Sequence, residues 1–123
     1  PQGFLGDTKG DRLISNMSPL IIESNEGIST IGSPGADRIS SAIAQVLINY
    51  SKNKNWKQAI DKPRFHVNGD GSVRAEPNSL VADNKITITE EYDMYFGGVC
   101  VSGLNKNVFS FGDKRRGDTS WEN

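Results

Sequence analysis

The sequence has few of the residues from which most chemical sites are built. It contains one cysteine, Cys100, and one histidine, His66. One cysteine cannot form an intrachain disulfide or supply a Cys-x-x-Cys metal pair. Because Cys100 lies in the apolar run Val99-Cys100-Val101, we expect a small buried strand residue there rather than a nucleophile. His66 has no second histidine or acid at ligand spacing, so we expect a structural role and no metal site.

The chain also lacks a large net charge and long hydrophobic runs. Its 14 basic and 15 acidic residues nearly cancel, whereas a nucleic-acid partner would need a clustered basic face. No apolar run approaches the ~20 residues of a membrane span. We therefore expect neither a nucleic-acid partner nor a membrane span.

The low apolar content indicates a chain that completes its core against another polypeptide. Hydrophobic residues make up 35% of the 123 residues, and 13 residues are glycine. The length fits one domain, 1–123, with an irregular lead-in at 1–11 and a tail at 118–123. The chain begins with Pro1 rather than Met, so we expect upstream sequence to have been removed.

The hydrophobic pattern predicts a hairpin followed by a long helix. Residues 19–23 and 28–31 have strand composition and flank turn residues at 24–27. A helix over about 36–52 follows from apolar residues that recur at helical spacing, namely Ile39, Ala42, Ile43, Val46, Leu47 and Tyr50.

The rest of the chain predicts one short helix and several strands. The short helix covers 55–61 and ends before Pro63, because the residue that precedes proline avoids helical angles. Strands are expected at 64–67, 72–76, 85–89, 97–103 and 107–112. The fold class is α+β, with mainly antiparallel strands, one long helix and one short helix.

The turn Gly32-Ser33-Pro34-Gly35-Ala36 points unpaired backbone N–H groups at whatever lies in front of the helix start. A Walker phosphate loop would need a lysine after the last glycine, and Gly35 is followed by Ala36, Asp37 and Arg38. Two alternatives remain. The turn is an oxyanion hole with two backbone donors, or an ordinary strand–helix turn whose glycines only permit the backbone angles.

Two further alternatives stay open at this point. A Ser-His-Asp triad that uses Ser15 or Ser33 is possible because triads are recognised by geometry rather than sequence order. The tripeptide Arg116-Gly117-Asp118 would serve cell adhesion only if a loop tip displayed it. We interpret Arg38 as a solvated or ion-paired side chain.

Five segments in order carry a resemblance to a known family. The motifs are Leu13-Ile14-Ser15-Asn16-Met17-Ser18-Pro19, Gly32-Ser33-Pro34-Gly35-Ala36, Pro63-Arg64-Phe65-His66, Phe96-Gly97-Gly98-Val99 and Asp113-Lys114-Arg115-Arg116-Gly117. In this order they resemble the C-terminal part of the small subunit of the gamma-glutamyltransferase (gamma-glutamyltranspeptidase) family. The resemblance spans residues 12–117, and it makes the Arg-Gly-Asp tripeptide the end of a family motif.

The resemblance implies an N-terminal-nucleophile hydrolase with an αββα sandwich, of which this chain holds part. In that family a precursor cuts itself, and the new N-terminal threonine attacks the gamma-glutamyl amide of glutathione-like substrates. The acyl-enzyme then passes to water or to an amino acid or peptide. By resemblance, Ser15 and Asn16 contact the substrate's alpha-carboxylate, and the N–H groups of Gly35 and Ala36 form the oxyanion hole. No metal or organic cofactor is implied.

The sequence departs from the family pattern at three points. Asn16 replaces a serine, and Ala36 replaces a glycine, which is tolerable only if residue 36 does not need a positive φ. We also expect Ala36→Pro to preserve the fold, since proline is accepted in a first helical turn. The nucleophile threonine belongs upstream of the matching segment, and Pro1 has no hydroxyl to replace it.

The missing threonine implies a partner. We expect the remainder of the same precursor, meaning the large subunit and the nucleophile segment, to complete the active site around a small gamma-glutamyl substrate. The isolated chain is then inactive. The alternative is a non-catalytic binding or assembly module that keeps the fold without the nucleophile. Family members are commonly periplasmic, secreted or surface-bound.

Overall fold

The computed structural model describes residues 15–79, 81 and 86–122. The lead-in 1–11 and the first two residues of the first motif, Leu13 and Ile14, lie outside the described residues. The elements in chain order are β1 (Leu20–Ser24), β2 (Gly27–Gly32), η1 (Ala36–Arg38), α1 (Ile39–Asn53), α2 (Trp56–Asp61), β3 (Phe65–Val67), β4 (Val73–Ala75), β5 (Ile86–Ile88), η2 (Met94–Phe96), β6 (Cys100–Leu104), β7 (Val108–Phe111), η3 (Lys114–Arg116) and β8 (Trp121–Glu122).

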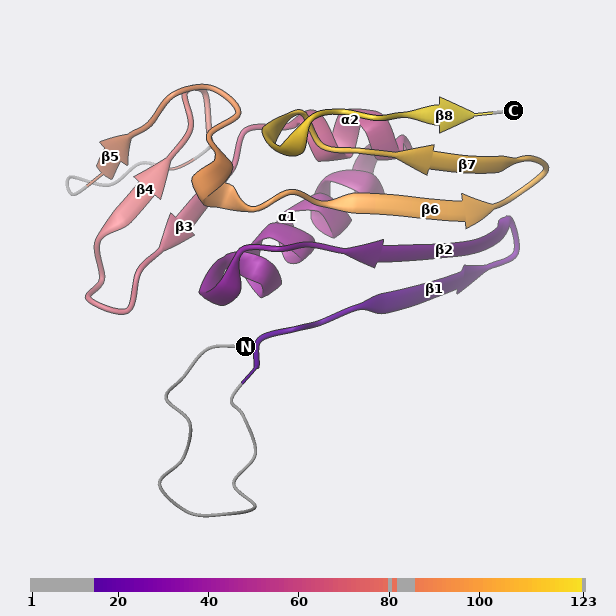
Figure 1. The fold of residues 1–123 in the computed structure, drawn as a ribbon, viewed down its shortest axis with the longest axis horizontal. Coiled ribbons are helices and arrows are strands. Elements are labelled where there is room, and N and C mark those ends of the chain that lie inside the picture. Colours follow the sequence, from indigo (N-terminus) through magenta and orange to yellow (C-terminus); the bar gives the residue numbers. More distant parts are fainter. Residues whose placement is uncertain (1–14, 80, 82–85, 123) are drawn as a thin grey trace, which may run out of the picture.

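A five-stranded antiparallel sheet forms the main layer (Figure 1), in the order β1-β2-β6-β7-β8. The predicted hairpin is confirmed as β1 and β2, with Leu20 opposite Ile31 and Ser24 opposite Gly27. The sequence analysis treats residues 118–123 as a tail. The structure differs, because Trp121 and Glu122 pair with β7 as an edge strand.

Helices α1 and α2 cover one face of this sheet and bury the core. The predicted apolar stripe is confirmed, since Ile39, Ala42, Ile43 and Val46 of α1 are buried. They pack with Ile31, Val101 and Phe109 of the sheet, with Val99 just before β6, and with Trp56, Ala59 and Ile60 of α2. The first turn of the predicted helix is the 3-10 turn η1, and the α-helix proper begins at Ile39. Asn55 caps α2 by accepting a hydrogen bond from the N–H of Gln58 at 2.9 Å.

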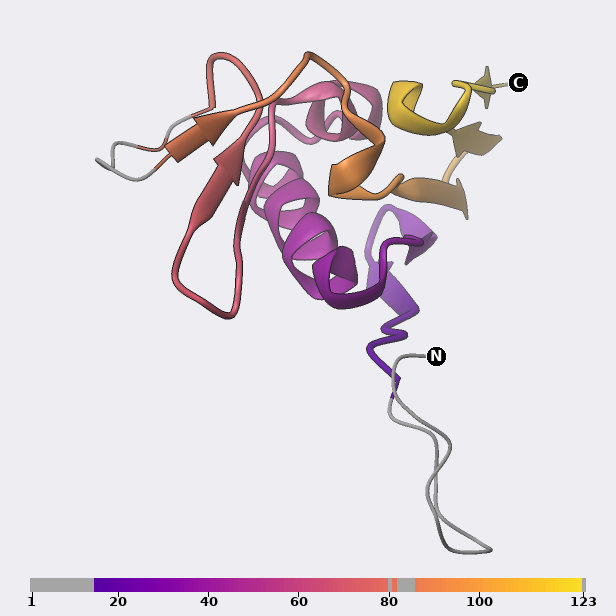
Figure 2. The same ribbon diagram turned by 60° about the vertical axis from the view of Figure 1, so that its left-hand side comes forward.

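A smaller sheet, β3-β4-β5, lies on the other side of α1 (Figure 2). Strands β3 and β4 are antiparallel, and β4 and β5 are parallel. Gln45 of α1 joins helix to strand, because its amide donates to the carbonyl of Phe65 at 2.9 Å and accepts from the N–H of Phe65 at 3.1 Å. The α+β class with one long and one short helix is confirmed.

The second face of the five-stranded sheet carries both apolar and polar side chains and is uncovered by any other part of the chain that the structure describes. Ile21, Ile28, Leu104 and Val108 alternate with the helix-facing residues along their strands, and each is more than half exposed. Thr30, Ser102 and Ser110 form a polar row on the same face, since they lie opposite one another on β2, β6 and β7. None of the described helices has the length and hydrophobicity needed to cross a bilayer.

Candidate functional site

The turn between β2 and α1 has a strained backbone. Gly35 has φ 131° and Ala36 has φ 57°, so both lie in the region that favours glycine. The condition set from the sequence, that residue 36 does not need a positive φ, is therefore not met. The expected tolerance of Ala36→Pro is also wrong, because proline fixes φ near −65° and residue 36 lies on the opposite side of the Ramachandran map.

The backbone N–H groups of Gly35 and Ala36 take no part in the first hydrogen bonds of the turn. The first hydrogen bond of the turn runs from the N–H of Arg38 to the carbonyl of Gly35 at 3.1 Å, and the next from Ile39 to Ala36. Within the described ranges, no acceptor faces the N–H groups of Gly35 and Ala36. Two adjacent free donors at a helix start are suited to a negatively charged oxygen.

The loop Gly97-Gly98 packs against this turn. A Cβ on Gly97 would lie 2.5 Å from the carbonyl oxygen of Pro34, and a Cβ on Gly35 would lie 3.2 Å from the Cα of Gly97. The N–H of Gly98 donates to the hydroxyl of Ser33 at 3.3 Å, and that hydroxyl donates to the carbonyl of Pro34 at 2.8 Å. Only glycine at position 97 lets the two backbones approach this closely.

Ser15 and Asn16 lie at the same end of the sheet as the turn. Because Leu20 pairs with Ile31, the segment before β1 and the segment after β2 leave the sheet on one side (Figure 1). Ser15 is exposed, and its hydroxyl accepts a hydrogen bond from the N–H of Met17 at 3.2 Å. Asn16 is half-buried, and its carbonyl accepts from the hydroxyl of Ser18 at 3.0 Å.

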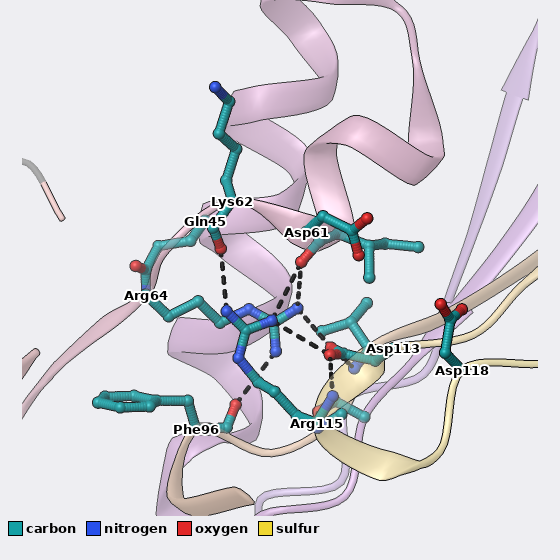
Figure 3. Close-up of polar contacts among 12 residues, drawn as sticks. Gln45, Asp61, Lys62, Arg64, Phe96, Asp113, Arg115 and Asp118 are labelled. Atoms are coloured by element: carbon teal, nitrogen blue, oxygen red, sulfur yellow. Dashed lines mark hydrogen bonds and ion pairs between the residues drawn. The ribbon is translucent and has the colours of Figure 1, made fainter. Parts of the chain in front are cut away.

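A buried network of four charged side chains supports the Gly97-Gly98 loop (Figure 3). Arg64, Glu76, Asp113 and Arg115 are each at most 2% exposed. Arg64 donates to the Asp113 carboxylate at 2.7 Å and to the carbonyl of Phe96 at 3.2 Å. Two guanidinium groups and two carboxylates balance in charge, which is a requirement for burying them.

The contacts of Arg115 and Asp113 within this network position the start of β6. Arg115 Nε donates to Glu76 Oε1 at 2.7 Å, and Arg115 Nη1 donates to Asp113 Oδ1 at 3.1 Å. Asp113 also accepts the N–H of Val99 at 2.8 Å. Burial acts to lower the pKa of Arg115, but the hydrogen bonds and charges of Glu76 and Asp113 outweigh it and raise that pKa. For Arg64, burial and then the charge of Arg115 lower the pKa.

Sequence reasoning assigned no role to this network. Its members come from two of the motifs that carried the family resemblance, Pro63-Arg64-Phe65-His66 and Asp113-Lys114-Arg115-Arg116-Gly117, together with Glu76. The available signal was the presence of charged residues inside those motifs.

The sequence analysis predicts a structural role for His66 and names no partner for it. It is buried, and its Nδ1 lies 3.0 Å from the hydroxyl of Ser41 on α1. Burial is the main cause that lowers the pKa of His66; the charge of Asp37 acts in the raising direction and that of Arg38 in the lowering direction. Neither Ser15 nor Ser33 is the histidine's hydrogen-bond partner in the part of the chain described, so this geometry does not support a triad through either serine.

The predicted burial of Cys100 is wrong. Val99 and Val101 are fully buried against the helices, but Cys100 is exposed. Successive side chains of a strand point to opposite faces of the sheet. Cys100 therefore lies on the open face, beside Gly32 in the register of β2 and β6.

Residues 8–108 match the family model described as Gamma-glutamyltranspeptidase. The chain is 36% identical over 92 residues to the glutathione hydrolase proenzyme of Pseudomonas sp. (strain A14), which covers 72% of this chain and 16% of that protein. It is 34% identical over 67 residues to the same type of proenzyme from Bacillus subtilis (strain 168), covering 53% of this chain and 11% of that protein. The chain thus spans less than a fifth of the length of these curated relatives.

Solved structures share the fold over nearly the whole chain. The transpeptidase CapD of Bacillus anthracis superposes with a TM-score of 0.75 at 22% identity, covering 97% of this chain and 77% of that one. A mutant gamma-glutamyltranspeptidase of Helicobacter pylori superposes with a TM-score of 0.68 at 26% identity, covering 90% of this chain and 69% of that one. The five-stranded sheet and its helices therefore share the fold of these transpeptidase structures.

Proposed function

Because this chain belongs to the gamma-glutamyltranspeptidase family, we propose that it forms the C-terminal part of a gamma-glutamyl hydrolase or transferase. In this proposal it supplies two parts of the active site, the oxyanion turn at Gly35 and Ala36 and the substrate-carboxylate loop at Ser15 and Asn16. The observation that carries the proposal is the pair of adjacent backbone N–H groups at Gly35 and Ala36 that face no acceptor in the described structure.

The two N–H donors suit an acyl-transfer reaction that passes through a negatively charged oxygen. A hydroxyl nucleophile attacks the carbon of the gamma-glutamyl amide, and the carbonyl oxygen becomes negatively charged. The N–H groups of Gly35 and Ala36 stabilise that oxygen, and they need no reorganisation because the turn already holds them. The proton of the hydroxyl passes to the amine, which leaves as the carbonyl reforms and the glutamyl group remains as an ester of the nucleophile. Water or a second amine then attacks that ester through the same charged state and gives up a proton to the nucleophile's oxygen, which leaves as the free hydroxyl.

Ser15 and Asn16 orient the substrate. A hydroxyl and an amide N–H both donate hydrogen bonds to a carboxylate, so the replacement of the family's serine by Asn16 keeps a donor. Their position at the same end of the sheet as the turn supports this assignment. A carboxylate held there would orient the gamma-glutamyl group for attack at the oxyanion turn.

The nucleophile comes from the remainder of a precursor. The relatives are named proenzymes, and this chain aligns with less than a fifth of each. The open face of the five-stranded sheet, with Ile21, Ile28, Leu104 and Val108 exposed, offers the apolar surface that a second sheet of the sandwich would cover. The isolated chain therefore lacks activity.

A second candidate is a binding or assembly module that has lost the chemistry. The positive φ of Ala36 favours it, because a residue with a Cβ occupies a conformation that glycine would adopt without strain. The replacement of the family's serine by Asn16 also favours the binding module.

Release of the chromophore from a gamma-glutamyl anilide by the complete precursor protein separates the two candidates. The enzyme proposal predicts turnover by the complete protein and none by the 123-residue chain. Ser15→Ala in the complete protein should raise KM about tenfold or more, because it removes one donor to a charged group. Ser51→Ala, at an exposed position in the last turn of α1, is the matched control. Absence of turnover by the complete, processed protein supports the binding module.

A further inference from the structure

A series of hydrogen bonds leads from β3 to the oxyanion turn. His66 Nδ1 lies 3.0 Å from the hydroxyl of Ser41, and that hydroxyl donates to the carbonyl of Arg38 at 3.0 Å. The peptide unit that contains this carbonyl also contains the N–H of Ile39, which donates to the carbonyl of Ala36. This series, which we call the His66 network, therefore ends on the residue whose own N–H faces the proposed oxyanion.

The contacts of the His66 network assign the proton on the imidazole ring. A carbonyl oxygen only accepts, so the contact between Ser41 and Arg38 uses the single proton of the Ser41 hydroxyl. The contact between Ser41 and His66 then needs a proton on Nδ1, because the hydroxyl has no second proton to give. In the neutral ring, His66 thus donates from Nδ1 and carries no proton on Nε2.

The side chain of Gln45 keeps β3 within reach of Ser41. It donates to the carbonyl of Phe65 at 2.9 Å and accepts from the N–H of Phe65 at 3.1 Å. The same amide group donates to the carbonyl of Ser41 at 3.0 Å. These three bonds tie the start of β3 to the first turns of α1, so His66, the next residue of β3, lies beside the Ser41 hydroxyl.

Both peptide units that flank Ala36 are held by the backbone of Arg38 and Ile39. The N–H of Ala36 shares a planar peptide unit with the carbonyl of Gly35, and that carbonyl accepts from the N–H of Arg38 at 3.1 Å. The carbonyl of Ala36 accepts from the N–H of Ile39. The orientation of the Ala36 N–H therefore depends on the peptide unit between Arg38 and Ile39, to which Ser41 is bonded.

We propose that His66 is a positioning residue, which acts through Ser41 to keep the N–H of Ala36 in the orientation that an oxyanion needs. This proposal rests on the proposed function and adds a residue to it. The charged oxygen forms only after the substrate has bound, so an interaction with it lowers the barrier and not the free energy of substrate binding. Loss of the His66 donor therefore lowers kcat and leaves KM unchanged.

Three variants of the complete protein separate this role from a general contribution to stability. Turnover of a gamma-glutamyl anilide gives kcat and KM, and circular dichroism verifies the fold of each variant. Ser41→Ala and His66→Leu should each lower kcat about tenfold at unchanged KM, the scale of one hydrogen bond. His66→Asn should restore kcat to within about threefold of the parent, because its amide N–H can donate to Ser41 in place of Nδ1.

Ser51→Ala is the matched control and should keep the parental kcat. The Ser51 hydroxyl donates to the carbonyl three positions earlier, that of Ile48, at 2.8 Å, as Ser41 does to Arg38, but it lies in the last turn of α1. The proposal is overturned, while the proposed function stands, if Ser41→Ala and His66→Leu keep the parental kcat. An equal fall of kcat in Ser41→Ala and Ser51→Ala overturns it as well.

Nuclear magnetic resonance of the complete protein gives a readout that needs no turnover. At about pH 7.5, where the imidazole is neutral, the ¹⁵N shifts of the His66 ring identify the protonated nitrogen, and the His66 signals are those missing from His66→Asn. We expect the proton on Nδ1, and a larger shift of the Ala36 amide signal in Ser41→Ala than in Ser51→Ala. If the complete protein turns over no gamma-glutamyl compound, the proposed function fails and these spectra alone decide whether His66 orients Ala36. A proton on Nε2, or an Ala36 signal that Ser41→Ala leaves in place, refutes it.

Discussion

Ala36 occupies a backbone conformation that is unfavourable for any residue with a Cβ. Its φ of 57° is left-handed, which costs about 1–2 kcal/mol for an L-residue. A glycine there would avoid that strain but would lose more conformational entropy on folding, by about 0.5–1 kcal/mol. The contacts around the turn, rather than the conformational preference of Ala36, therefore keep the turn in this conformation.

Ala36→Gly should raise the free energy of unfolding by about 0.5–1 kcal/mol, the difference between those two effects. Denaturant unfolding of the protein is the measurement. Ala44→Gly is the matched control, because Ala44 is exposed in the middle of α1, and glycine there should lower stability by about 1 kcal/mol. Equal destabilisation by both substitutions would show that residue 36 is not strained in solution.

His66 makes stability depend on pH in a defined direction. Burial lowers its pKa in the folded protein, so the unfolded chain takes up the proton more readily. The contribution of His66 is present above the unfolded pKa, about 6.5, and is lost as the pH falls below that value. Acidification from neutral pH to about pH 5 should therefore destabilise the parent more than His66→Asn, whose amide retains a partner for Ser41.

Since the chain has one histidine, the difference between parent and His66→Asn reports the titration of His66 separately from that of the carboxylates. The free energies of unfolding of both proteins are measured across that pH range. Parallel curves for the two proteins would mean that the folded and unfolded pKa values of His66 are the same.

At the scale of elements, the contact between the Gly97-Gly98 loop and the oxyanion turn positions the N–H donors. Gly97 and Gly71 have similar φ values, 79° and 82°, but only Gly97 has a neighbour within 4 Å of an added Cβ. Gly97→Ala should thus push Pro34 away and lower kcat of the complete protein, whereas Gly71→Ala should lower stability alone. A kcat equally preserved in both variants would show that the loop does not hold the turn.

The helices and most strands could be predicted because their patterns are local. The stripe of Ile39, Ile43 and Val46 fixes the buried face of α1 whatever surrounds it. Cys100 was mispredicted because a short apolar run does not reveal which faces of a strand are covered. Its exposure depends on the second face of the sheet, which no other described element covers.

The turn itself was only partly predictable. A glycine-rich strand–helix junction was evident from Gly32, Pro34 and Gly35, but the positive φ of Ala36 was not, because the residue type does not favour that conformation. That positive φ explains why Ala36→Pro cannot serve as a simple test of the N–H donor, because proline fixes φ near −65°.

At the scale of the whole molecule, the buried charge network joins segments that no local pattern connects. Arg64 and Asp113 are 49 positions apart, and charged residues are almost always exposed. Their burial could not be predicted without the tertiary structure. The network links α2, the Gly97-Gly98 loop and η3, so it couples the position of the loop to the fold as a whole.

Asp113→Asn should lower the free energy of unfolding by about 3–5 kcal/mol, because it leaves buried guanidinium charge without compensation. Asp118→Asn is the matched control. Asp118 pairs with Lys57 near the surface, and the loss of such a pair costs about 0–1 kcal/mol. Denaturant unfolding of both variants gives the comparison, and a loss below about 1 kcal/mol for Asp113→Asn would contradict the role of the network.

The central claim is that the N–H of Ala36 stabilises an oxyanion. Replacing Ala36 by lactic acid in the complete protein converts one backbone amide to an ester, which deletes that N–H while the chain can keep its positive φ. The reference is Ala36→Gly, which retains the N–H, and circular dichroism verifies the fold of both. The account predicts that kcat for a gamma-glutamyl anilide falls by about 10²–10³ relative to the reference. A folded ester variant with kcat within roughly threefold of the reference would contradict it and leave the turn with a structural role alone.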